Sequence, residues 1–208
     1  MINLAELRRM AARQITEPFK TVLVKSRLKP NTLTWLALAI SVIAAGTIAT
    51  NHLVIGGLLV LISGLFDILD GALARLTNQA TRFGALLDST FDRISDAIVL
   101  LGLLALYIRG EGTIEIVLIF LALIGALLTS YVRARAEGLG VNCPVGLFTR
   151  TERVIILALG LLLNPLCKFS ILIALVILIV LGFVTVGQRL VYVRQQAKGH
   201  KANKGEKE

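Results

Sequence analysis

The chain has 208 residues, of which 56% are hydrophobic and 17% are charged, and its formal net charge is +9. Its apolar share lies above the roughly 45 to 50% of ordinary globular domains, which excludes a soluble domain and indicates an integral membrane protein. The positive charge suits contact with anionic membrane lipids, and we expect no nucleic-acid partner.

The N-terminal segment, residues 1–29, is predicted to be cytoplasmic and amphipathic. Between residues 2 and 15, apolar side chains fall near one side of a helix and arginines fall towards the other. This pattern is typical of an interfacial helix that lies along the membrane surface, and a short helix packed on cytoplasmic loops would share it. Pro18 should end or kink this helix, and Asn31 or Thr32 can cap the helix that follows.

Six apolar stretches come next, each near the roughly 20 residues that a helix needs to cross the hydrocarbon of a bilayer. They lie near residues 32–50, 53–75, 84–108, 114–136, 151–166 and 169–193, the fifth being short. We therefore predict an all-α integral membrane protein with six transmembrane helices. These helices form one domain over residues 30–195, and residues 196–208 form a basic cytoplasmic tail.

The distribution of positive charge predicts the orientation. All but two of the 22 lysines and arginines lie before the first stretch, around the second and fourth turns, or near the C-terminus. Only Arg109 and Lys168 lie at the other end of the predicted helices. By the positive-inside rule, both termini are cytoplasmic, in a multi-pass protein of the plasma membrane. Cys143 and Cys167 then lie about 30 Å apart across the hydrocarbon and cannot form a disulfide.

Four aspartates interrupt the second and third stretches. Asp67 and Asp70 are three residues apart, and Asp88 and Asp92 are four apart, so each pair shares a helical face. Antiparallel packing across the short turn between the stretches would bring the pairs together. An ionised side chain at membrane depth costs roughly 3 kcal/mol or more, so this cluster needs cations or a wet cavity. Oxygen-rich sites of this kind suit Mg²⁺ or Mn²⁺.

Small residues and an arginine follow the first pair. Gly71 lets a ligand approach the backbone, Ala74 keeps the same face shallow, and Arg75 offers a guanidinium fork that matches phosphate. With a metal ion, they predict a pocket for a phosphorylated substrate that opens to the cytoplasm. Intramembrane salt bridges with nearby arginines, or a cation transporter, are the alternatives. The acids crowd towards one end of the helices, which argues against a transport pathway.

The string D-x2-D-G-x2-A-R-x8-G-x3-D-x3-D resembles the signature of the CDP-alcohol phosphotransferases, the membrane enzymes that make phospholipid head groups. Its fixed positions are Asp67, Asp70, Gly71, Ala74, Arg75, Gly84, Asp88 and Asp92. In that family, an alcohol attacks a cytidine diphosphate lipid and releases CMP. The resemblance implies two Mg²⁺ or Mn²⁺ ions held by Asp67, Asp70, Asp88 and Asp92. Asp92 would also be the catalytic general base. The implied CDP-lipid-binding residues are Asn31, Asp67, Gly71, Ala74, Arg75 and Gly84.

Three further basic stretches, residues 130–137, 150–153 and 188–189, indicate an acceptor that carries its own phosphate. They look like those of the phosphatidylinositol phosphate synthase branch, which uses inositol 1-phosphate. By that similarity, the acceptor would be bound by Arg133, Arg135, Arg153 and Arg189. Arg133 stands where lysine is expected in many relatives, which keeps the charge but changes the hydrogen-bond geometry. Arginines at cytoplasmic helix ends also serve membrane orientation, which is the simpler explanation for each alone.

The resemblance therefore implies phospholipid synthesis, by transfer of the phosphatidyl group of CDP-diacylglycerol to inositol 1-phosphate. Two related reactions stay open. Glycerol 3-phosphate as the acceptor would give phosphatidylglycerol phosphate, and an archaeol lipid would give archaetidylinositol phosphate. The resemblance also implies a homodimer, with no indication of which surface forms the contact.

Overall fold

The computed structural model describes residues 30–77, 79 and 81–205, with residues 10, 14 and 16–19 near the N-terminus, and side chains as far as residue 197. This part of the chain is helical and holds no strand. After a 3-10 turn at Glu17–Phe19, its helices are α3 (Pro30–Ala49), α4 (Leu53–Leu76), α5 (Arg82–Arg109), α6 (Thr113–Gly138), α7 (Arg150–Leu162) and α8 (Ser170–Gly205). The predicted amphipathic helix over residues 2–15 lies largely outside the described residues.

Four helices are long and apolar enough to cross a membrane: α3, α4, α6 and the Ser170–Ala197 part of α8. The expected all-α membrane architecture is thus confirmed at this coarser level. Helix α5 occupies the predicted third stretch and carries several charged residues in its first half.

Helix α7 ends earlier than the expected stretch 151–166. It has 13 residues and ends at Leu162, so it is about 20 Å long and shorter than the roughly 30 Å of hydrocarbon. Asn164 and Pro165 follow, and the proline ring disfavours the helical conformation for the residue before it. Helix α8 instead continues beyond the expected residue 193 and takes in most of the basic tail, to Gly205.

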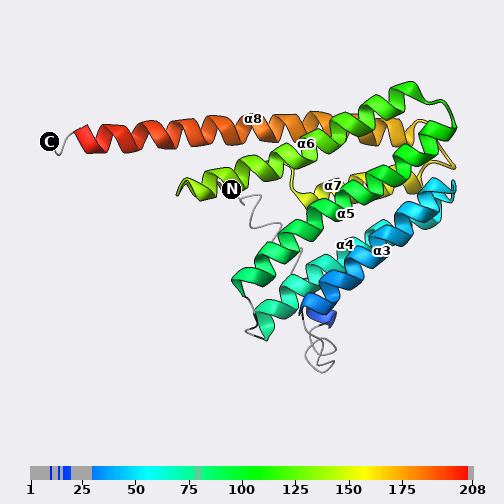
Figure 1. Ribbon diagram of the computed structural model, residues 1–208, viewed down its shortest axis with the longest axis horizontal. Coiled ribbons are helices and arrows are strands. Elements are labelled where there is room, and N and C mark those ends of the chain that lie inside the picture. Colours follow the sequence, from blue (N-terminus) through cyan, green and yellow to red (C-terminus); the bar gives the residue numbers. More distant parts are fainter. Residues whose placement is uncertain are drawn as a thin grey trace.

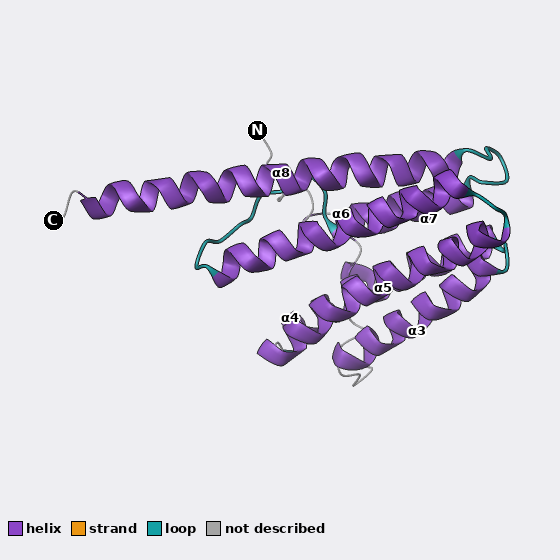
Figure 2. Ribbon diagram, turned by 45° about the horizontal axis from the view of Figure 1, so that its top comes forward, coloured by secondary structure: helices purple, strands orange, loops and turns teal. Residues whose placement is uncertain are grey.

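The helices run back and forth along one another (Figure 1). The α3–α4, α5–α6 and α7–α8 links lie at one end, on the right of Figure 1, and the α4–α5 and α6–α7 connections lie towards the other. Helix α3 packs on α4 and α5, α6 packs on α5 and α8, and α7 packs on α4 and α8. In Figure 2, α3, α4 and α5 form one side of the bundle, with α6, α7 and α8 on the other. Buried side chains such as Ile48, Leu103, Leu161 and Leu175 belong to one apolar core that joins the two sides.

Helices α3 and α5 approach most closely at Gly102. A Cβ atom on Gly102 would lie 2.6 Å from the Ala45 carbonyl oxygen and 2.7 Å from the Ala45 Cα. Gly102→Ala should therefore force the backbones apart and lower the free energy of unfolding by about 1 to 3 kcal/mol. Thermal unfolding in detergent would measure the loss. Gly46→Ala is the control, because a Cβ there meets no atom within 4 Å. Equal melting temperatures for the two variants would contradict this close approach.

Candidate metal and substrate site

Three aspartates converge at the end of the bundle where α4 meets α5. Asp67 and Asp70 lie near the end of α4 and Asp88 near the start of α5, and one carboxylate oxygen of each lies within 4.8 Å of the others. Asp70 is 4% exposed and accepts a hydrogen bond of 2.8 Å from Thr34 Oγ1 in α3. The expected convergence of these three residues is therefore present.

The route to this convergence differs from the expected direct packing of α4 on α5. These two helices hardly approach each other, and α3 packs closely on both. Thr34 ties α3 to Asp70, and Thr81 Oγ1 begins α5 by accepting a hydrogen bond of 2.9 Å from the Gly84 amide. Helix α3 thus holds the carboxylates near one another while a space remains between α4 and α5.

The chemistry of this cluster fits a divalent metal ion. Three carboxylate oxygens so close together repel one another, and hard divalent cations prefer oxygen ligands of this kind. Asp67, Asp70 and Asp88 are the residues that would hold such an ion.

Asp92 is not one of these three, but it lies beside Asp67 and interacts with it. Its Oδ1 atom is 2.9 Å from Arg150 Nη1 in α7, in an ion pair. That oxygen is buried, and no described group donates a well-directed hydrogen bond to it. Asp92 therefore lies beside the carboxylate cluster with the Arg150 guanidinium as its counter-charge.

A pocket between α3, α4 and α5 brings together nearly all of the predicted CDP-lipid residues. Its lining includes Asn31, Asp70, Gly71, Ala74, Arg75, Gly84 and Asp88. Asp67 does not line it and instead faces an apolar groove between α4 and α7, beside Arg150.

The two glycines of the pocket leave space for other groups. A Cβ on Gly71 would lie 3.6 Å from Arg75 Nη1. A Cβ on Gly84 would lie 2.9 Å from Thr81 Oγ1 and 3.6 Å from Asn31 Oδ1. Glycine at residue 84 therefore accommodates the cap of α5 and leaves Asn31 at the pocket wall.

Arg150 is the central residue that the sequence analysis did not select. Its side chain is 15% exposed and pairs with Asp67 and Asp92, and its Nε atom lies 3.5 Å from Asp96 Oδ1. A capping box between Thr149 and Glu152 fixes the first turn of α7, from which Arg150 projects. The available signal was spacing: Arg150 and Arg153 share a face of α7, as Asp92 and Asp96 share a face of α5.

Two of the four predicted acceptor arginines meet at Thr129 in α6. Arg153 Nη1 donates to Thr129 Oγ1 at 3.4 Å, and Arg189 Nη1 donates to the Thr129 carbonyl oxygen. Arg189 is 6% exposed, and its Nε also donates to the Val145 carbonyl oxygen at 3.0 Å. Arg153 and Arg189 thus bring two positive charges to the same point of α6, where they could contact a phosphate.

The other two arginines are exposed and diverge. Arg133 lies one turn beyond Thr129, has a 56% exposed side chain, and forms a 2.9 Å ion pair with Glu137. Arg135 is also exposed and projects from another side of α6.

Known proteins are similar to this chain in sequence and in fold. A family model described as CDP-alcohol phosphatidyltransferase matches residues 27–204. The chain is 41% identical over 159 residues to the archaetidylinositol phosphate synthase of Methanothermobacter thermautotrophicus, covering 74% of this chain and 77% of the relative. It is 39% identical over 185 residues to the phosphatidylinositol phosphate synthase of Mycobacteroides abscessus, covering 87% and 84%.

Two crystal structures of the Mycobacterium tuberculosis phosphatidylinositol phosphate synthase are also similar, each 34% identical with a TM-score of 0.76. One has CDP-DAG bound, and the match covers 86% of this chain and 94% of that one. The other is a complex with manganese and citrate, and the match covers 86% and 88%.

Proposed function

Because the chain belongs to the CDP-alcohol phosphatidyltransferase family, we propose that it transfers the phosphatidyl group of CDP-diacylglycerol to inositol 1-phosphate. CMP is released and phosphatidylinositol phosphate is formed. The observation that carries the proposal is the meeting of three carboxylates beside a pocket that contains the other signature residues. Relatives near 40% identity that are phosphatidylinositol phosphate synthases support the choice of acceptor.

In this proposal, Asp67, Asp70 and Asp88 hold two Mg²⁺ or Mn²⁺ ions, and Asp92 completes the site. Divalent ions supply neutralisation of the diphosphate and of the CMP leaving group. The manganese in a related crystal structure supports a divalent ion at these carboxylates.

Other residues of the chain bind the CDP-lipid and accept the proton of the attacking alcohol. The nucleotide part of the CDP-lipid is bound by Asn31, Asp67, Gly71, Ala74, Arg75 and Gly84. Arg75 offers directed hydrogen-bond donors to the phosphates, and the two glycines leave room for the ligand. Asp92 is the general base. It takes the proton from the attacking hydroxyl as the new oxygen–phosphorus bond forms and the bond to CMP breaks. Its place next to Asp67, one of the proposed metal ligands, supports this role.

Arg133, Arg135, Arg153 and Arg189 are the proposed contacts of the acceptor phosphate. Arg153 and Arg189 are held around Thr129, and Arg133 follows on the same helix. Arg135 is the least well placed of the four, because it projects from another side of α6.

We further propose that the chain crosses the plasma membrane six times, with both termini and the site on the cytoplasmic face. The short helix α7 makes the fifth crossing together with the residues that follow it. The lysine and arginine distribution supports this orientation, since the site end of the bundle carries the arginines and the other end has only Arg109 and Lys168. The proposed domain organisation of the chain is an interfacial segment over residues 1–29, a six-helix domain over residues 30–195 and a basic tail over residues 196–208. A homodimer is the proposed assembly, as the family resemblance implies.

A CMP-release assay with CDP-diacylglycerol tests the proposed reaction. We expect release with inositol 1-phosphate in Mg²⁺ or Mn²⁺, and none after the divalent ions are removed with EDTA. Release with glycerol 3-phosphate alone would overturn the proposed acceptor. Release with neither acceptor would favour the transporter alternative.

The lipid backbone is tested by a second donor. The archaetidylinositol phosphate synthase at 41% identity favours an archaeol lipid as the second candidate. Faster CMP release from CDP-archaeol than from CDP-diacylglycerol would support that substrate.

A further inference from the structure

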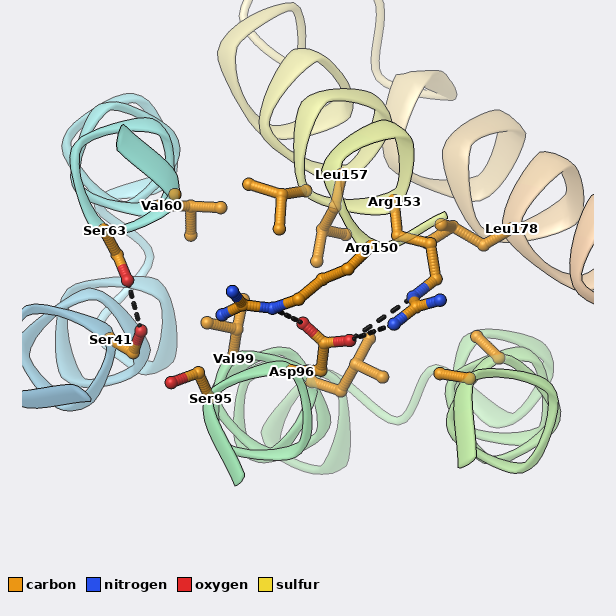
Figure 3. A pocket seen from close by; sticks show the side chains of 15 residues that line it. Ser41, Val60, Ser63, Ser95, Asp96, Val99, Arg150, Arg153, Leu157 and Leu178 are labelled. Atoms are coloured by element: carbon orange, nitrogen blue, oxygen red, sulfur yellow. Dashed lines mark hydrogen bonds and ion pairs between the residues drawn. The ribbon is translucent and has the colours of Figure 1, made fainter. Parts of the chain in front are cut away.

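Asp96 is a buried carboxylate that lies between the two halves of the proposed site. It lies one helical turn beyond Asp92 in α5, and its side chain is 13% exposed. Its Oδ2 atom is 2.8 Å from Arg153 Nη2 and 3.3 Å from Arg153 Nε, while its Oδ1 atom faces Arg150 Nε at 3.5 Å. Figure 3 shows both guanidinium groups turned towards this single carboxylate.

The two arginines lead from Asp96 to different groups. Arg150 continues to Asp67 and Asp92, beside the proposed metal ions. Arg153 continues to Thr129 Oγ1, at the point where Arg189 also binds α6. Asp96 therefore joins the carboxylate cluster to the proposed acceptor arginines.

The apolar surroundings of Arg150 and Arg153 make the Asp96 carboxylate necessary for holding the two guanidinium groups close together. Asp96, Arg150 and Arg153 line one cavity, shown in Figure 3. Apart from these charged groups and three serines, its wall consists largely of apolar side chains such as Val99, Leu157 and Leu178. Two guanidinium groups near each other in such surroundings repel and need a buried counter-charge.

The dependence of the two arginines on Asp96 is unequal. Without the carboxylate, Arg150 keeps its ion pairs with Asp67 and Asp92. Among the described residues, Arg153 then keeps the 3.4 Å hydrogen bond to Thr129 Oγ1 as its one side-chain partner. Loss of the Asp96 charge should therefore release Arg153 much more than Arg150.

We propose that Asp96 is a positioning residue that aims Arg153 at the phosphate of the acceptor and fixes its place relative to the general base Asp92. The inference rests on the proposed function and adds a residue outside the signature string. It assigns the effect of Asp96 to the binding of the phosphorylated alcohol and not to the binding of the CDP-lipid.

Asp96→Asn tests this assignment, because the amide keeps the shape and removes the charge. The KM for inositol 1-phosphate should rise about tenfold or more, since charged hydrogen bonds to Arg153 are lost. The KM for CDP-diacylglycerol should stay within about twofold of the native value. A smaller folded fraction would lower the maximal rate and leave both KM values unchanged, whereas similar rises in both KM values would overturn the assignment. Glu115→Gln, the same chemical change in the first turn of α6 at the other end of the bundle, is the matched control and should leave both KM values unchanged.

A double variant tests whether Asp96 acts through Arg153. Asp96→Asn combined with Arg153→Gln should raise the KM for inositol 1-phosphate no further than Arg153→Gln alone. Fully additive effects would overturn the positioning role.

The native protein separates failure of this inference from failure of the proposed function. If it releases CMP with inositol 1-phosphate but Asp96→Asn has an unchanged acceptor KM, only the positioning role fails. If it does not use inositol 1-phosphate, the proposed reaction fails. Equilibrium binding of inositol 1-phosphate then tests the role of Asp96 separately. Binding that is about tenfold weaker in Asp96→Asn, and unchanged in Glu115→Gln, would support this role. Equal affinity of Asp96→Asn and the native protein would overturn it.

Discussion

Replacement of Asp92 by asparagine is expected to lower kcat for CMP release by about 10³-fold, within the range that a general base contributes. The amide cannot accept the proton of the attacking hydroxyl. CDP-lipid binding should change only a few-fold, because Asp92 is absent from the lining of the pocket between α3, α4 and α5. Single-turnover CMP release and equilibrium binding of CDP-diacylglycerol would measure the two effects separately.

The same substitution at Asp96 provides the comparison for Asp92. Both residues lie on one face of α5 and both face Arg150, so the two variants remove equal charge from neighbouring positions. We expect a kcat effect at Asp92 and an acceptor KM effect at Asp96. A kcat for Asp92→Asn within tenfold of the native value would rule out Asp92 as the general base.

Asp67→Asn is expected to weaken both divalent-ion binding and turnover. The substitution removes one of three converging carboxylates and also removes a partner of Arg150. The Mn²⁺ concentration for half-maximal CMP release should rise at least about 100-fold. This is more than the typical loss of metal affinity when a residue that only hydrogen-bonds to a metal ligand is replaced. CDP-lipid binding in the presence of Mn²⁺ should weaken as well.

Direct titration of Mn²⁺ without substrate provides a readout independent of turnover. Asp92→Asn should bind Mn²⁺ more tightly than Asp67→Asn, because Asp92 lies outside the group of three carboxylates. Equal and mild effects of both substitutions would contradict the division of roles between these aspartates.

Hydropathy predicted the helices well because apolar length is a local property of the sequence. The expected stretch 53–75 corresponds to α4 at Leu53–Leu76, and 84–108 corresponds to α5 at Arg82–Arg109. The early end of α7 was also readable from Asn164 and Pro165, but its apolar composition continues to Leu166 and concealed the boundary. The length of α8 was not readable, since its last turns are basic and carry no apolar signal.

The candidate site was partly predictable for a similar reason. The spacing of Asp67, Asp70 and Asp88 places their side chains on helical faces, and the structure brings these three together. Spacing within one helix does not determine which neighbouring helix faces it. The pairing of Arg150 with Asp67 and Asp92 depends on the packing of α7 against α4, so it became visible only in the fold.

The close approach at Gly102 has a consequence for the distant pocket. Fourteen residues of α5, or about 21 Å of helix, separate Gly102 from Asp88. Helix α3 touches α5 backbone to backbone at Gly102, and its other end carries Asn31 and Thr34 into the pocket wall. A small change in the angle between α3 and α5 at this contact would therefore shift Asn31 and Thr34 relative to Asp88, at the opening where the nucleotide would enter.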